Sequence, residues 1–225
     1  RTEAEILGIE QRRAGVQEIG RVAPRLDAYA KVTGAEKFAA DFYPDGHLWA
    51  GVKRPDYAHA RILAIDTAEA LSVPGVVAVL THKDIRGKNR LGIFEKDQPV
   101  LADERVRHYG DAVALVVAET KTALAEGLTA VRVKYEALPA VFDPESALLP
   151  AAPILHPGRP EGNVLLAAEI TCGKGAAGLG DCACTASLTM ALGPQEHAFL
   201  ETQNGVARRD EAGELWLTVS TQTPF

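Results

Sequence analysis

The chain has 225 residues, of which 47% are hydrophobic and 24% are charged, an ordinary composition for a globular protein. Its formal net charge of −6 and its lack of Lys/Arg-rich runs argue against a nucleic-acid-binding protein. No apolar run reaches the roughly 20 residues that a transmembrane helix needs, so we expect no membrane span.

The three cysteines, Cys172, Cys182 and Cys184, are an odd number gathered in one region. A secreted domain held by disulfides would have a denser and more even set, so we expect a cytoplasmic protein. The one methionine is Met190, which means that Arg1 is not a translational start. We therefore expect these residues to be a piece of a longer protein.

The first elements along the chain follow a polar segment. Residues 1–24 mix charged and polar residues without an amphipathic face, which predicts a linker or arm. Apolar runs then predict strands at 48–52, 62–66 and 76–80. The continuous run at 76–80 is expected to be buried on both faces. A short helix should begin after Asp66 and end before Pro74.

The next elements give the strongest patterns. A polar loop at 83–98 and a short strand at 106–109 precede the most apolar strand, at 112–118. Thr120 can cap a helix at 121–130, and the alternating residues at 131–135 predict another strand. Prolines then mark a connection with a short helix near 145–149. We expect the segments 76–81, 112–118 and 131–135 to share one mixed sheet, covered on one face by the helix, in an α+β domain.

Two motifs in the following region resemble known binding sites but lack essential parts. Residues 173–178 match G-x-G-x-x-G after a possible strand at 164–170, but Gly178 and Gly180 would weaken the helix that a dinucleotide site requires. The cysteines form C-x9-C-x-C, with His197 as the nearest candidate for a fourth metal ligand. We interpret them as buried free thiols that behave as small apolar residues.

The last part of the chain predicts a hairpin. Leu215, Leu217 and Val219 alternate with polar residues, and the turn signal at 208–213 separates this strand from a first strand around 194–202. The second strand ends at Ser220-Thr221-Gln222. The amide of Gln222 can donate and accept hydrogen bonds without adding charge, which suits a polar ligand. The alternative is an ordinary residue at the end of a strand.

Several ordered segments together resemble the N-terminal portion of the molybdenum-binding large subunit of the xanthine dehydrogenase and aldehyde oxidoreductase family, the molybdenum hydroxylases. They cover about residues 25–225 and comprise residues 27–35, Ala39-Ala40-Asp41, His59-Ala60-Arg61-Ile62, Pro74-Gly75-Val76, residues 81–85, 99–102, 106–110 and 135–139, Gln195-Glu196-His197, Leu200-Glu201-Thr202 and Ser220-Thr221-Gln222.

The resemblance implies a particular domain order. After the linker or arm at 1–24, an α/β-hammerhead domain with a mixed sheet would occupy 25–143, and a connecting segment would occupy 144–159. Residues 160–225 would begin the first molybdenum-cofactor-binding domain, itself α+β and incomplete here. Residues 172–192 depart from the family, which usually has an acidic helix and a valine-rich strand there.

The resemblance also implies an activity and its partners. The family oxidises an aldehyde or an aromatic heterocycle with water-derived oxygen, using a molybdopterin-type molybdenum cofactor. Electrons pass to [2Fe–2S] clusters, and in some arrangements to FAD, on partner domains or subunits. The residue that resembles Gln222 lies near molybdenum without being a direct ligand. The family's catalytic glutamate lies beyond the position of Phe225, so we expect no catalytic residue in this chain. The alternative is a non-catalytic assembly module that docks iron–sulfur or flavin partners.

Overall fold

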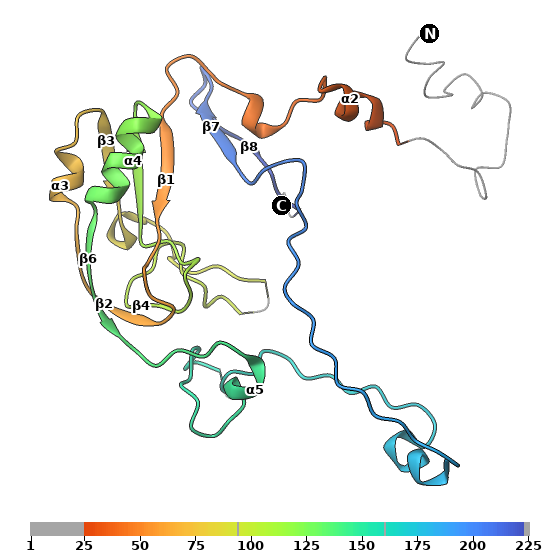
Figure 1. Ribbon diagram of the computed structural model, residues 1–225. Helices are drawn as coiled ribbons and strands as arrows, with labels where there is room; N and C mark the ends of the chain where they lie inside the picture. The colour runs from red at the N-terminus through yellow and green to blue at the C-terminus, as the bar shows by residue number, and fades with distance from the viewer. Residues whose placement is uncertain (1–24, 94, 160, 223–225) are drawn as a thin grey trace, which may run out of the picture. The chain divides into compact units, whose positions relative to one another are not determined.

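A computed structural model describes residues 25–93, 95–159 and 161–222 (Figure 1). The predicted arm at 1–24 lies outside the described residues. The described chain divides into two compact units. One unit is continuous and runs from Gly46 to Leu188, and the other combines the residues up to Asp45 with those from Thr189 onward.

The continuous unit contains a three-stranded antiparallel sheet. Its strands are β1 (Trp49–Lys53), β5 (Ala114–Ala118) and β3 (Val76–Leu80), in the order β1-β5-β3. β5 occupies the centre of this sheet and alternates buried with partly buried residues. Because it pairs on both edges, the most apolar strand of the sequence takes the most protected position.

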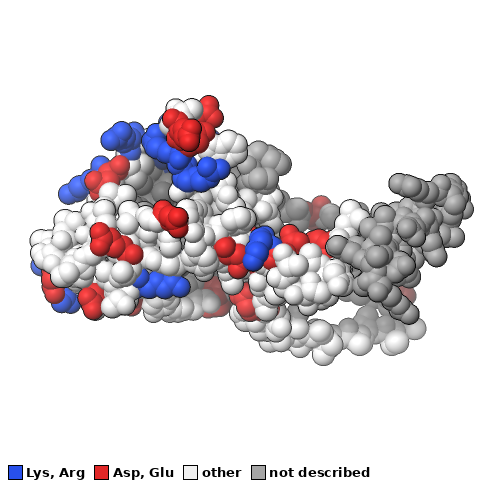
Figure 2. All heavy atoms as spheres, turned by 90° about the horizontal axis from the view of Figure 1, so that it is seen from above, with Lys and Arg blue, Asp and Glu red and all other residues white. Residues whose placement is uncertain are grey.

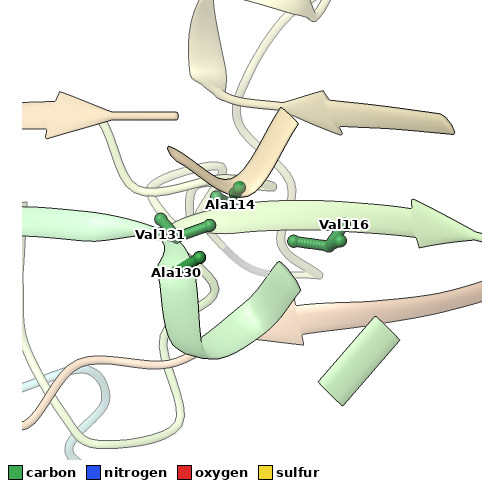
Figure 3. Packing of buried hydrophobic residues seen from close by; sticks show 5 residues of the cluster. Ala114, Val116, Ala130 and Val131 are labelled. Carbon is green, nitrogen blue, oxygen red and sulfur yellow. The ribbon is translucent and has the colours of Figure 1, made fainter. Parts of the chain in front are cut away.

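Helix α4 (Lys121–Ala130) covers one face of this sheet. Thr120 caps it, since its Oγ1 accepts a hydrogen bond of 3.1 Å from the amide of Ala123. Gly127 permits close packing, because a Cβ at this position would lie 2.8 Å from Val76 Cγ2. Figure 3 shows Ala130 and Val131, at the end of the helix, packed beside Ala114 and Val116 of β5.

A second antiparallel sheet has the order β4-β2-β6. Its strands are β4 (Arg105–Val106), β2 (Ala60–Asp66) and β6 (Arg132–Ala137). Its buried residues, Ala60 and Val106, join Ala102 and Val113 in a second apolar cluster. Short elements connect the two sheets and continue the chain, namely α3 (Ala68–Leu71), η3 (His82–Asp84) and α5 (Pro144–Ala147).

The α+β class and the predicted helix at 121–130 are confirmed, but the single mixed sheet is wrong. Both sheets are antiparallel, and β6 pairs with β2 instead of joining β3 and β5. Periodicity predicts that a segment is a strand but does not identify its partner. The expectation that 76–80 is buried on both faces is also wrong. β3 is an edge strand, and Val77 is 51% exposed.

Three other strand predictions need correction. The described residues at 164–170 and at 194–202 contain no strand. The strand expected at 106–109 is the two-residue β4. The glycine-rich segment forms η4 (Gly175–Asp181), a 3₁₀ helix, so the α-helix that a dinucleotide site needs does not begin there.

The described surface carries charges of both signs. On the face in Figure 2, basic and acidic side chains are interspersed without a large area of one sign. The described residues on this face therefore form no extended basic stripe for a phosphate backbone. Among the described helices, none has the length and hydrophobicity needed to cross a membrane.

Candidate functional site

The predicted hairpin near the end of the chain is present, with a first strand later than expected. β7 (Gly205–Arg209) pairs with β8 (Leu215–Val219) in antiparallel register. Gly213 has a φ of 84°, a left-handed conformation that glycine adopts without steric cost. The first strand was expected at 194–202, where the apolar residues are in fact part of an irregular segment.

Asp210 holds the turn of this hairpin. Its carboxylate accepts hydrogen bonds of 2.8 Å from the amide of Glu214 and 2.8 Å from Nε1 of Trp216. These two hydrogen bonds stabilise the charged carboxylate and so lower the pKa of Asp210. The bond from Trp216 has the larger effect, and the bond from Glu214 follows. The turn and the first residues of β8 are therefore tied together by one side chain.

The backbone ladder continues one step beyond β8. The amide of Ser220 donates a hydrogen bond of 3.0 Å to the carbonyl of Asn204. Gly205 lies opposite Val219, where an added Cβ would be only 2.7 Å from Val219 Cγ1. The glycine thus allows the strands to approach closely, and Gln222 follows two residues after Ser220.

The N-terminal part of the same unit contributes a short helix with a glycine cap at its C-terminal end. α2 (Ala28–Thr33) ends at Gly34, whose φ is 74°. Asp27 precedes the helix, and its carboxylate lies 2.7 Å from Lys31 Nζ and 3.0 Å from an Nη of Arg25. Hydrogen bonds from Lys31 first and Arg25 second lower the pKa of Asp27 to about 2. The carboxylate therefore neutralises part of the positive charge of both side chains.

Residues of both segments line a cavity of about 640 Å³. Gln222 lines it, and its side-chain amide is exposed and has no hydrogen-bond partner among the residues that the structure describes. The residues that share the cavity come from the same unit and are Arg25, Lys31, Phe38, Phe199, Leu200, Glu201, Gln203, Ser220 and Thr221. The walls therefore combine two aromatic rings, two amides, two hydroxyls and both signs of charge.

The structure places only some of the residues of the C-terminal motifs at this cavity. Leu200 and Glu201 line it with Gln222, whereas His197 stacks on Phe199 with 5.3 Å between ring centroids. Ala198, between these two rings, has a φ of 51°, which turns the chain sharply. The role of Gln222 stays a prediction.

Sequence reasoning did not identify Arg25, Lys31, Phe38 and Gln203 as neighbours of Gln222. The first three come from a segment far away in the chain, so no local pattern could join them to the hairpin. The spacing of Asp27 and Lys31, followed by Gly34, is nevertheless the signal of a short helix with an i,i+4 ion pair and a glycine cap.

The cysteines differ from the expectation. Cys172, Cys182 and Cys184 are free thiols, and all three are exposed, so the interpretation as buried apolar residues is wrong. They lie in and around the glycine-rich turn, which contributes no buried residue to either apolar cluster. Among the described residues, no group of three or more His, Cys, Asp or Glu side chains could hold a metal ion.

Comparisons with known proteins agree with the fold. Residues 33–139 match the family model for "Aldehyde oxidase and xanthine dehydrogenase, a/b hammerhead domain". The nicotinate dehydrogenase large molybdopterin subunit of Eubacterium barkeri is 39% identical over 92% of this chain and 48% of its own length. A probable xanthine dehydrogenase subunit of Bacillus subtilis is 38% identical over 92% of this chain and 27% of its own length.

Solved structures give the same result. The aldehyde oxidoreductase of Desulfovibrio gigas has a TM-score of 0.73 and 33% identity, covering 86% of this chain and 23% of that chain. The chain thus spans no more than about half of the length of these two curated relatives. The expected hammerhead fold is confirmed. Residues 33–139 are an a/b hammerhead domain of the aldehyde oxidase and xanthine dehydrogenase family, and the chain is homologous to the N-terminal portion of that family's large molybdopterin subunits.

Proposed function

We propose that this chain is part of a molybdenum hydroxylase that oxidises an aldehyde or an aromatic heterocycle with water-derived oxygen. The homology of 92% of the chain to a large molybdopterin subunit supports the enzyme class. The observation that supports the proposal most directly is the cavity that Gln222 lines together with Gln203, Ser220 and Thr221, where its amide has no partner among the described residues. The proposed domains are the hammerhead domain at 25–143, the connection at 144–159 and the beginning of the cofactor-binding domain at 160–225.

The residues around Gln222 fit a polar organic cofactor. Amides at Gln203 and Gln222 and a hydroxyl at Ser220 supply neutral donors and acceptors, and the cavity is larger than a single ring requires. Arg25 and Lys31 are partly neutralised by Asp27, so the donor set favours hydrogen bonding over the binding of a strong point charge. When bound, the molybdenum cofactor would supply the redox chemistry, accepting two electrons from the substrate.

In this proposal, Gln222 orients the cofactor without binding the metal. Its position after the anchored amide of Ser220 restricts the backbone, so the side-chain amide can be directed with little loss of entropy. The catalytic glutamate comes from the remainder of the subunit, whether that lies on the same polypeptide or on another. A [2Fe–2S] domain or subunit, with an FAD subunit in some arrangements, receives the electrons. The free thiols support a cytoplasmic setting.

The test replaces Gln222 in the intact enzyme. Gln222→Ala should lower kcat by ~10²–10³, the typical effect of losing one preorganised donor that acts in the transition state. Gln222→Glu should be worse, because its negative charge would face an electron-rich centre. Gln195→Ala is the matched control, since Gln195 is an exposed amide of the same unit that does not line the cavity. Its kcat should stay within about twofold of that of the unmodified enzyme, a margin well below the donor effect.

Molybdenum content and thermal stability must be measured on the same preparations. The proposal expects turnover to fall far more than the melting temperature, because an exposed amide without partners contributes little to folding. Unchanged turnover of Gln222→Ala with molybdenum fully loaded would remove Gln222 from the site. An intact complex that contains no molybdenum would instead favour the non-catalytic assembly module.

A further inference from the structure

The connecting segment, residues 144–159, is organised by hydrogen bonds of its own. It begins with α5, and the side chain of Asn163 then ties three of its points together. Asn163 Nδ2 donates hydrogen bonds of 3.1 Å to the carbonyl of Ala147 and 3.0 Å to that of Pro153. Asn163 Oδ1 accepts one of 3.0 Å from the amide of Leu155. The segment is therefore a compact element that one amide side chain holds together.

This segment has little apolar attachment to the two sheets of its unit. Among its described residues, none belongs to either apolar cluster. Its side chains Leu148, Leu149 and Ile154 are all exposed, Leu148 at 66%. Because apolar burial against the sheets is small, the position of the segment depends on polar contacts.

Asp97 makes most of these polar contacts. Its Oδ2 accepts a hydrogen bond of 2.6 Å from Nδ1 of His156 and one of 2.7 Å from Nη2 of Arg159. An ionised carboxylate only accepts, so Nδ1 of His156 carries the proton. The three side chains are partly buried, which limits screening of the contact by solvent and salt. A further bond of 2.7 Å joins Nε of Arg107 to the carbonyl of Leu155.

The surroundings of Asp97 keep its carboxyl group charged. Partial burial raises its pKa, but the hydrogen bond and charge of His156, followed by those of Arg159, lower it by more, so the pKa lies below its usual value. Both donors come from the connecting segment, 59 and 62 positions away in the sequence. One carboxylate thus closes two long-range contacts at the same oxygen.

We propose that Asp97 is a latch that holds the connecting segment on the hammerhead domain and allows it to detach as a unit. When the two bonds to Asp97 break, both sheets keep their fold, because the segment contributes to neither apolar cluster. The connection then becomes a hinge between the hammerhead domain and the residues that follow. This inference does not depend on the role proposed for Gln222.

Hydrogen–deuterium exchange of the intact protein, measured by mass spectrometry, follows the segment and the sheet in one experiment. Peptides within residues 153–159 report on the segment through the amides of Leu155 and Arg159, which are both hydrogen-bonded. Peptides of β5 report on the sheet. Asp97→Ala removes both bonds and should raise the exchange rate in the segment at least about tenfold, the effect of losing a hydrogen bond to a charged group. Exchange in β5 should stay unchanged.

Further variants test whether the two donors act through one contact. Asp97→Asn keeps a neutral acceptor and should raise exchange less than Asp97→Ala does. Arg159→Ala should add little to the effect of Asp97→Ala, because both substitutions break the same contact. Glu95→Ala is the matched control, since Glu95 is an exposed acid of the same loop and takes no part in these bonds. Its exchange should equal that of the unmodified protein.

Three results would overturn the proposal. The first is unchanged exchange of residues 153–159 in Asp97→Ala, which would mean that other contacts hold the segment. The second is a parallel rise of exchange in β5, which would mean that the segment and the sheet unfold together. The third is full additivity of Asp97→Ala and Arg159→Ala, which would mean that the two side chains act independently.

Discussion

The sheet β1-β5-β3 and the hairpin β7-β8 both contain strands rich in apolar residues, but these residues are buried in β5 and exposed in β8. In β5, Ala114, Val116 and Ala118 are fully buried, because they lie on the face of the sheet that α4 covers. In β8, all five residues are exposed, including Leu217 at 62%. Apolar patterns therefore predict a strand in both regions, a continuous run for β5 and alternation for β8, but burial depends on a covering element that neither pattern encodes.

This difference has an energetic meaning. A two-stranded hairpin is marginal by itself, whereas a three-stranded sheet under a helix can bury enough apolar surface to be stable. In the hairpin, local side-chain bonds such as those of Asp210 take over part of the organising role. Substitutions in the two regions should accordingly have very different effects.

The largest contrast should come from placing one charge in each region. Val116→Asp puts an unpaired carboxylate into a fully buried position and should lower the free energy of unfolding by more than about 4 kcal/mol. Leu217→Asp, on the exposed strand, should change the free energy of unfolding of the hammerhead unit by about 0.5 kcal/mol or less. Urea denaturation followed by circular dichroism measures both, and equal effects would contradict the comparison.

A smaller effect is expected where α4 approaches the sheet. Gly127→Val should lower the free energy of unfolding by about 2–3 kcal/mol, because the new side chain would overlap Val76 and Val116. Gly87→Val is a matched control, since an added Cβ at Gly87 meets no atom within 4 Å. Thermal melts of the two variants should differ clearly, and similar melts would mean that α4 can shift away from the sheet.

Loss of the cap of α4 should have a more modest effect. Thr120→Ala removes the oxygen that accepts from the amide of Ala123 and should lower the free energy of unfolding by about 1 kcal/mol. Thr120→Ser retains the acceptor and should recover most of the loss. Chemical denaturation resolves a difference of this size, and equal stability of the two variants would show that the cap does not stabilise the helix.

The smallest effect should appear in the hairpin at acid pH. The folded state lowers the pKa of Asp210, so its contribution to hairpin stability is present above the unfolded value, near 3.8. That contribution is lost as the pH falls through the lower folded pKa. In a Trp49→Phe background, the fluorescence of Trp216 should be constant from about pH 7 to 5 and change below about pH 4. Asp210→Ala should already have the altered spectrum at pH 7 and should lack this transition.

Much of the secondary structure could be predicted from the sequence, for physical reasons that differ by element. β5 and α4 follow from a continuous apolar run and from a capping threonine before a helical repeat. The hairpin strand β8 follows from alternation. These signals are local, since each depends on residues within a few positions of one another.

The arrangement of elements and the companions of Gln222 could not be predicted in this way. β6 alternates like a partner of β5 but pairs with β2, a choice determined by tertiary packing. Lys31 lines the same cavity as Gln222 although the whole continuous unit separates the two residues in sequence. The exposure of Cys182, which directly follows η4, likewise depends on tertiary packing and not on a local pattern.

The strand order β1-β5-β3 also determines when the sheet can form during synthesis. β1 and β3 do not pair with each other, and both require β5, which is the last of the three to leave the ribosome. Residues 54–113 must therefore be made before β1 finds its partner, and until then the edges of β1 and β3 are open to other chains. No local hairpin can nucleate this sheet, so closing the long connection should make its formation slow. We expect nascent chains that stop before Ala114 to recruit chaperones, and those that extend past Ala130 to become resistant to protease.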